Sequence, residues 1–414
     1  MVIPEFRLER YFARWEFSAP YLLSCSDCES MSVAEVLELA GEPLSTLTTL
    51  RLGYTESQGD PALRAAIARF YSRVSADQVV VTNAPEEAIL LTALALLKPG
   101  DRVVVQTPCY QSLFELPAFR GCQVASWPMQ ETEHGWRLDL DQLAELVTPD
   151  TRLVIVNLPH NPTGYLPSPD EFDAILSLVA RQGVWLFCDE MYRGLEYDPG
   201  QRLPAAADRY PRAVSLWGMS KTFGLAGLRI GWLASTDTWF IQEVQRLKDY
   251  TTICSSAPSE LLARLALNQA ETLMQRNVSI IQANLAQVRP FMQRWMQLFA
   301  WRAPSAGPIA FVRWHQGSAL AFCTELTQGC GVLLVPSTVF DFGDQHLRWG
   351  FGRRNFLGTP ARNASPGCAI ERFTGRNSPI PQDRPGFHTG CGKRQRRAAV
   401  NRRRWHPGNP TPVF

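Results

Sequence analysis

Between about residues 43 and 250, short apolar runs rich in β-branched residues alternate with stretches in which apolar positions recur every three to four residues. The first pattern is typical of buried strands and the second of amphipathic helices. Their alternation predicts an α/β fold with a mainly parallel, helix-covered sheet. The predicted strands span 78–82, 102–106, 123–127, 152–158, 184–189, 213–216 and 230–234, and the predicted helices 61–73, 85–97, 140–147 and 168–181.

The pattern changes after residue 237. Residues 237–299 lack strand patterns and predict a long helical stretch with one break near 255–258. Three short predicted strands and one helix follow, which indicates a second, smaller α+β domain. These elements span 309–314, 331–335, 346–351 and, for the helix, 318–327. We expect residues 1–42 to contribute an N-terminal segment to the small domain, 43–250 to form the large domain and 251–356 the small C-terminal domain.

Composition excludes several classes of protein. The chain has 414 residues, of which 45% are hydrophobic and 19% charged, which rules out a disulfide-stapled miniprotein and a wholly disordered chain. No apolar run approaches the ~20 residues of a membrane-spanning helix. Ten scattered cysteines and no secretory leader favour free thiols in the cytoplasm. Cys25-x-x-Cys28 lacks a second pair or a nearby histidine, so no metal site is expected.

Charge is unevenly distributed along the chain. The net charge is only +2, but residues 357–414 contain 11 Lys+Arg and 2 Asp+Glu, together with eight prolines and seven glycines. Such a stretch buries too little apolar surface to offset its ordering entropy, so we predict a disordered basic tail. Seven basic residues lie in 393–404 with Trp405 as the single neighbouring aromatic residue, so we do not expect a nucleic-acid partner.

Two residues of the segment 220–232 carry candidate chemistry. Lys221 lies between a predicted strand and a glycine-rich turn among small and apolar neighbours, where desolvation lowers the pKa of an amine and makes it nucleophilic. Arg229 lies in an apolar run, where a charge requires an anion such as phosphate. The alternative interpretation is a surface lysine and a structural arginine.

Two further strands end in polar residues. Asp189 follows the apolar run 184–188, and Asn161 stands in the rigid turn 159–164 after another apolar strand. Ligands of open α/β sheets bind at the carboxyl ends of the strands, where a carboxylate can hold a cationic nitrogen. A capping aspartate and a plain turn are the alternative interpretations.

The order Asn161, Asp189, Tyr192, Lys221, Arg229 resembles the class I/II aminotransferases, which are fold-type I pyridoxal-phosphate (PLP) enzymes. The resemblance implies a three-layer sandwich around the central sheet. It also implies that Lys221 forms an aldimine with PLP, that Asp189 pairs with the ring nitrogen, that Asn161 and Tyr192 hold the phenolate oxygen, and that Arg229 and Ser220 bind the phosphate. Lys221, Asp189 and Tyr192 are the expected catalytic residues.

Four more positions match the family. Tyr110 corresponds to the aromatic residue that stacks on the ring, and Arg348 to the arginine that binds the substrate α-carboxylate, with Asn161 beside it. Tyr54 corresponds to the tyrosine that reaches the phosphate of the neighbouring subunit, which implies a homodimer with shared sites. Glu86 lies in the turn that cradles the phosphate, where the family has a small or hydroxyl residue, so we expect weaker phosphate binding there.

The resemblance implies an aminotransferase that moves an amino group from an amino acid to a 2-oxo acid. Residues 7–12, 22–29 and 307–311 resemble instead capreomycidine synthase, a fold-type I enzyme that cyclises a hydroxylated arginine. Elimination or cyclisation on the same cofactor is therefore the second interpretation, and a catalytically inactive PLP-binding regulator the third.

The chain departs from the family after the substrate arginine. There the family continues into an amphipathic helix that closes the small domain, whereas this sequence becomes rich in proline, glycine and arginine. We hypothesise that the reading frame shifts near Phe356.

Overall fold

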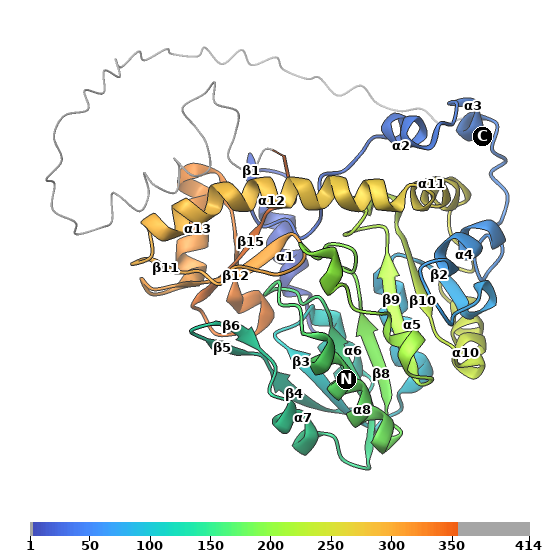
Figure 1. Ribbon diagram of the computed structural model, residues 1–414, viewed down its shortest axis with the longest axis horizontal. Coiled ribbons are helices and arrows are strands. Elements are labelled where there is room, and N and C mark those ends of the chain that lie inside the picture. Colours follow the sequence, from blue (N-terminus) through green and yellow to red (C-terminus); the bar gives the residue numbers. More distant parts are fainter. Residues whose placement is uncertain (1–2, 355–414) are drawn as a thin grey trace, which may run out of the picture. The chain divides into compact units, whose positions relative to one another are not determined.

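The computed structural model describes residues 3–354, so the predicted tail 357–414 and the hypothesised frame shift lie outside the described residues. Its centre is a seven-stranded sheet in the order β2-β10-β9-β8-β7-β3-β4 (Figure 1). Every neighbouring pair is parallel except those of β10, which runs antiparallel to β2 and β9. The strands are β2 (Val79–Asn83), β3 (Arg102–Thr107), β4 (Gln123–Pro128), β7 (Thr151–Asn157), β8 (Trp185–Asp189), β9 (Ala213–Gly218) and β10 (Ile230–Ala234).

Helices bury both faces of this sheet. Successive side chains of each strand point to opposite faces, so each strand contributes to both cores. Val103 and Val105 of β3 pack with α5 (Pro85–Leu96), α6 (Gln111–Phe119) and α10 (Thr238–Lys248). Val104 packs with α7 (Leu140–Leu146) and α8 (Pro169–Gln182) on the other face. The predicted mainly parallel, helix-covered sheet is confirmed, and each strand begins and ends within two residues of its predicted range.

Local sequence explains where the helices begin and end. Ser168 and Glu171 form a reciprocal capping box at the start of α8, and Gly183 ends that helix in the left-handed conformation (φ 64°) that glycine adopts without strain. Helix α6 was not predicted from the sequence, because Pro117 interrupts its helical pattern. Helices α1 (Arg7–Trp15) and α2 (Val33–Ala40) were not predicted either.

A second, four-stranded sheet follows in the order β11-β12-β15-β14. The long helix α12 (Ala270–Arg294) runs from the region of α11 (Ala257–Leu267) to this sheet (Figure 1). The predicted strand 331–335 is two short strands, and the first of them, β13 (Val332–Leu333), pairs in parallel with β1 (Tyr21–Leu22) of the N-terminal segment. The sheet consists of β11 (Phe299–Ala300), β12 (Ile309–Trp314), β14 (Val335–Pro336) and β15 (His346–Gly350), with α13 (Ala319–Cys330) beside it.

The remaining elements are short. They are α3 (Ser45–Thr48), α4 (Pro61–Ala68), α9 (Ala206–Arg209) and the hairpin β5 (Gln130–Thr132) and β6 (Gly135–Arg137). Among residues 3–354, no helix combines the length and the apolar character that crossing a membrane requires. The eight cysteines of this part of the chain carry free thiols, and Cys109 and Cys188 are buried.

Candidate active site

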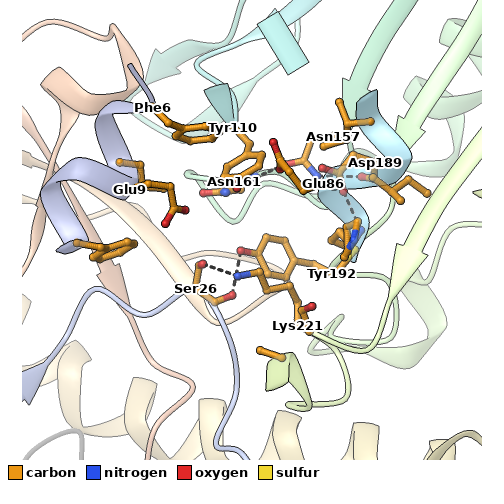
Figure 2. A pocket seen from close by; sticks show the side chains of 18 of the residues that line it. Phe6, Glu9, Ser26, Glu86, Tyr110, Asn157, Asn161, Asp189, Tyr192 and Lys221 are labelled. Carbon is orange, nitrogen blue, oxygen red and sulfur yellow. Dashed lines mark hydrogen bonds between the residues drawn. The ribbon is translucent and has the colours of Figure 1, made fainter. Parts of the chain in front are cut away.

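A cavity of about 520 Å³ lies at the carboxyl ends of the parallel strands. Asn157 is the last residue of β7 and pairs across the sheet with Asp189, the last residue of β8, while Ser220 and Lys221 follow β9. Because parallel strands end at the same edge, residues far apart in sequence meet there. Nine of the ten predicted site residues line the cavity: Glu86, Tyr110, Asn161, Asp189, Tyr192, Ser220, Lys221, Arg229 and Arg348. Figure 2 labels six of them, namely Glu86, Tyr110, Asn161, Asp189, Tyr192 and Lys221.

Asp189 is buried at the floor of this arrangement, with only 6% of its surface exposed. Its Oδ1 accepts a hydrogen bond from the Met191 backbone N–H at 3.0 Å, and the Asn157 Nδ2 donates to the Asp189 carbonyl oxygen at 2.9 Å. Burial raises the pKa of the Asp189 carboxyl to about 7. A cation placed against it favours the charged form, so the site suits a protonated ring nitrogen.

Lys221 points its amine toward the N-terminal segment. Its Nζ donates a hydrogen bond to Ser26 Oγ at 2.9 Å, and Tyr192 OH donates to the Ser26 carbonyl oxygen at 3.0 Å (Figure 2). Burial lowers the pKa of Lys221, as the sequence predicted, while the nearby Asp27 opposes that shift. Burial raises the pKa of Tyr192, so its hydroxyl remains a hydrogen-bond donor.

Arg348 is completely buried on β15. Its Nη2 donates to the Ser24 carbonyl oxygen at 3.0 Å and its Nη1 to Asn161 Oδ1 at 3.4 Å, whereas Nε has no partner. None of the ion pairs within residues 3–354 involves this guanidinium, and burial lowers its pKa. A buried cation without a carboxylate partner is costly, and an anionic ligand would relieve that cost.

The structure corrects the argument made for Arg229. The sequence predicted an arginine confined to an apolar run, but its side chain is exposed at the edge of the cavity. The reason is local: the residue follows the short 3₁₀ turn η3 (Ala226–Leu228) in a left-handed conformation (φ 55°), and its Nη1 donates to the Ala226 carbonyl oxygen at 3.2 Å. Nearby, the Ser220 hydroxyl is buried without a hydrogen-bond partner.

Glu86 lies in the first turn of α5. Ser112 donates a hydrogen bond to its carboxyl, and burial raises its pKa. Tyr110 lies beside it and packs its ring against Phe6 at 5.1 Å between centroids. Tyr54 is 92% exposed and does not line the cavity.

Sequence reasoning missed four residues of the site. Glu9 and Phe12 reach the cavity from α1, and Ser26 from the loop after β1. The fourth residue, Asn157, positions both Asp189 and Asn161. Its Nδ2 donates to the Asp189 carbonyl oxygen, and its Oδ1 accepts a hydrogen bond from the Asn161 backbone N–H at 2.6 Å. The position of Asn157, a polar residue at the end of an apolar strand, could have predicted its place in the site. For Glu9, Phe12 and Ser26 the sequence offered no such pattern beyond the resemblance of residues 7–12 and 22–29.

His160 has a structural role in the turn that precedes Asn161. The side chain is fully buried, with Nε2 2.8 Å from the Pro108 carbonyl oxygen and Nδ1 2.7 Å from Thr163 Oγ1. Burial lowers its pKa to about 3, so the ring is neutral and Nε2–H is the donor to Pro108.

Comparison with known proteins identifies the class. The model of the family "Aminotransferase class I and II" matches residues 22–362, and the chain belongs to this family. The fold is that of fold-type I PLP enzymes, and the family's cofactor is pyridoxal phosphate.

Individual relatives include more than one activity. Capreomycidine synthase of Streptomyces vinaceus is 32% identical over 84% of this chain and 90% of its own length, and valine–pyruvate aminotransferase of Mycobacterium tuberculosis is 30% identical over 79% and 87%. A PLP-dependent aminotransferase from Streptococcus suis superposes with a TM-score of 0.85 at 28% identity, covering 92% of this chain and 100% of that one. The PLP-dependent cyclase OrfR superposes with a TM-score of 0.83 at 32% identity, covering 91% and 99%.

The residues of the cavity fit PLP. The cofactor combines an aldehyde, a ring nitrogen and a phosphate, and the cavity offers an amine at Lys221, a buried carboxyl at Asp189 and a guanidinium at Arg229. The unsatisfied hydroxyl of Ser220 is a further donor for the phosphate. One acidic group, Glu86, opposes the phosphate, and its raised pKa reduces its negative charge.

Proposed function

We propose that this protein is a PLP-dependent aminotransferase that moves an amino group from an α-amino acid to a 2-oxo acid. The observation that carries the proposal is that Lys221, Asp189 and Arg348 line one cavity. The first two suit the cofactor's aldehyde and ring nitrogen, and the third suits a substrate carboxylate that a guanidinium binds through two parallel hydrogen bonds.

The other predicted site residues that line the cavity have proposed holding roles. Asn161 and Tyr192 would hold the phenolate oxygen of the ring, and Tyr110 would stack on its face. The phosphate would be held by Arg229, Ser220 and the N-terminal turn of α5, which contains Glu86.

When bound, PLP supplies a ring that accepts the electron pair left on the substrate Cα when its proton departs. The residues of this chain orient the groups and move the proton. Lys221 Nζ, with its pKa lowered by burial, is the proposed general base at Cα. Asp189 would hold a proton on the ring nitrogen by its negative charge. Ser26 receives the hydrogen bond of Lys221 Nζ and so positions the amine before it acts.

We also propose a homodimer in the cytoplasm, with Tyr54 of each subunit serving the site of the other. The exposure of this tyrosine supports the idea, since 92% of its surface is free of contacts within its own protomer. Eight free thiols among the described residues support a reducing compartment. The domain boundaries at residues 42, 250 and 356 remain part of this proposal.

An acceptor-dependent assay tests the proposed reaction. Purified holoenzyme is incubated with a panel of amino acids and either pyruvate or 2-oxoglutarate, and both new products, the 2-oxo acid and the new amino acid, are measured. Lys221→Ala should abolish turnover and the retention of cofactor after borohydride treatment, whereas Lys98→Ala, an exposed lysine in a turn, should change neither. Absence of product with every donor and both acceptors would contradict the proposal.

Cyclisation or elimination is the second candidate. It is favoured by the position of the N-terminal segment, because the resemblance to capreomycidine synthase lies in residues 7–12 and 22–29, which supply Glu9, Phe12 and Ser26 to the cavity wall. Consumption of a β-hydroxylated amino acid without any 2-oxo acid acceptor would support this reaction instead of transamination.

A further inference from the structure

The proposed function assigns a cofactor or substrate group to only some of the charged side chains in the cavity. Six charged side chains line it: Glu9, Glu86, Asp189, Lys221, Arg229 and Arg348. Four of these are assigned above to the ring nitrogen, aldehyde and phosphate of the cofactor and to the α-carboxylate of the substrate. Two carboxyl groups remain.

Only one of these carboxyl groups is free. Glu86 accepts a hydrogen bond from Ser112, and burial favours its neutral form. Asp27, which lies near Lys221, is neutralised by Arg353 through both oxygens at 2.9 and 3.0 Å. Glu9 is a solvent-exposed residue of the cavity wall, and it makes neither a hydrogen bond nor an ion pair with any residue of the part of the chain that the structure describes.

Glu9 lies close to the site proposed for the substrate. It is three residues before Phe12 on α1, so both side chains lie on the same face of the helix and both line the cavity. The Arg348 guanidinium lies 5.8 Å from the centre of the Phe12 ring. Figure 2 shows Glu9 pointing from α1 into the pocket. Arg348, the proposed anchor of the substrate, therefore lies beside a residue that is one helical turn from Glu9.

We propose that Glu9 determines substrate specificity by binding a positively charged group, a guanidinium or an ammonium, at the end of the substrate's side chain. This inference rests on the proposed function, because it takes Arg348 as the anchor of the α-carboxylate. The cavity then places one unpaired negative charge where the side chain extends, and the other carboxyl groups are satisfied by the cofactor or by the protein. A neutral side chain would leave Glu9 without a partner, whereas an anionic one would be repelled.

The test compares amino acids that differ in charge but hardly in shape. Arginine is paired with citrulline, and lysine with norleucine. Binding to the holoenzyme is followed by the change in cofactor absorbance, and turnover by 2-oxo acid release. We expect the cationic member of at least one pair to bind about fivefold more tightly, which corresponds to the ~1 kcal/mol of a solvent-accessible ion pair.

Three variants separate charge from shape. In Glu9→Gln, the binding affinities for the two members of the pair should differ by no more than about twofold. Glu9→Asp should retain part of the preference, because it keeps the charge. Glu5→Gln removes the same charge from an exposed position outside the cavity and should leave the preference unchanged. Thermal melting verifies that each variant is folded.

The outcomes distinguish this inference from the proposed function. Equal binding of the paired amino acids by the unmodified enzyme, or a preference that survives in Glu9→Gln, would overturn the role of Glu9 and leave the aminotransferase assignment intact. If no amino acid of either charge changes the cofactor spectrum or yields product, the proposed function fails and the role of Glu9 falls with it.

Discussion

Lys221 and Ser26 are 195 positions apart in the chain, yet the lysine Nζ donates a hydrogen bond to the serine Oγ at 2.9 Å. The lysine follows the central strand β9, whereas the serine belongs to the N-terminal segment that pairs with β13 near the second sheet. One hydrogen bond thus joins the two halves of the candidate site.

Ser26→Ala removes the acceptor of the Lys221 amine and keeps the backbone carbonyl to which Tyr192 donates. We expect kcat to fall by about tenfold, which corresponds to the ~1.4 kcal/mol of one hydrogen bond. The melting temperature should change little. Steady-state kinetics on one good substrate measures the effect, and an unchanged kcat would show that the bond does not position the amine.

Asp189 predicts a pH dependence of stability in the cofactor-free protein. Its pKa is raised from 3.8 to about 7, so the folded state binds the proton more tightly than the unfolded state. Stability is therefore greatest at low pH for this group and falls as the pH rises from about 4 to 7. Melting curves over this range should decline less steeply for Asp189→Asn than for the unmodified protein. Parallel curves would contradict the raised pKa.

Added PLP should counteract that loss. A protonated ring nitrogen beside Asp189 stabilises the carboxylate, so the holoenzyme should lose less stability over the same pH range than the cofactor-free protein. Asp189→Asn should show no such difference in slope, and a slope that PLP leaves unaltered would argue against the pairing of Asp189 with the ring.

Arg348→Lys tests recognition of the α-carboxylate. A lysine keeps the charge but loses the planar pair of donors that binds a carboxylate through two parallel hydrogen bonds. We expect kcat/KM to fall by about a hundredfold, or ~3 kcal/mol, with cofactor binding retained. Arg246→Lys, in an exposed pair with Glu243, is the matched control and should behave as the unmodified enzyme. A similar loss for both variants would remove the special role of Arg348.

Glu86→Ser introduces a hydroxyl in place of a carboxyl in the proposed phosphate turn. PLP should bind about tenfold more tightly, because an acidic group facing the anion is lost and a donor is gained. The advantage should grow with pH as Glu86 of the unmodified protein becomes ionised. Pyridoxal, which has no phosphate, is the control ligand. If Glu86→Ser raises the affinity for pyridoxal as much as the affinity for PLP, Glu86 acts on the ring rather than on the phosphate.

Tyr54 allows a complementation test of shared sites. Separate homodimers of Lys221→Ala and Tyr54→Ala should both be impaired. When the two proteins are unfolded and refolded together, each mixed dimer should contain one intact site, formed by Lys221 of one subunit and Tyr54 of the other. Activity that recovers on mixing supports the arrangement, and activity equal to the average of the separate proteins opposes it.

Most of the central sheet was predictable because its strands are buried on both faces. Such strands, for example 102–106 and 152–158, are continuous apolar runs with clear ends, and the residues that follow them had to lie at one edge of the sheet. Asn161, Asp189 and Lys221 could therefore be placed together before any coordinates. Helix α6 was missed because Pro117 breaks the helical pattern although tertiary packing holds the helix together.

The sequence by itself determined the seven strands of the central sheet, the polar residues at the strand ends and the family, because these depend on local patterns and on the carboxyl-end rule of parallel sheets. Only the tertiary structure decided that Arg229 is exposed, that Asn157 links Asp189 to Asn161, and that Glu9 and Ser26 line the cavity. These relationships join segments far apart in the chain, and long-range packing, which no local pattern encodes, sets them.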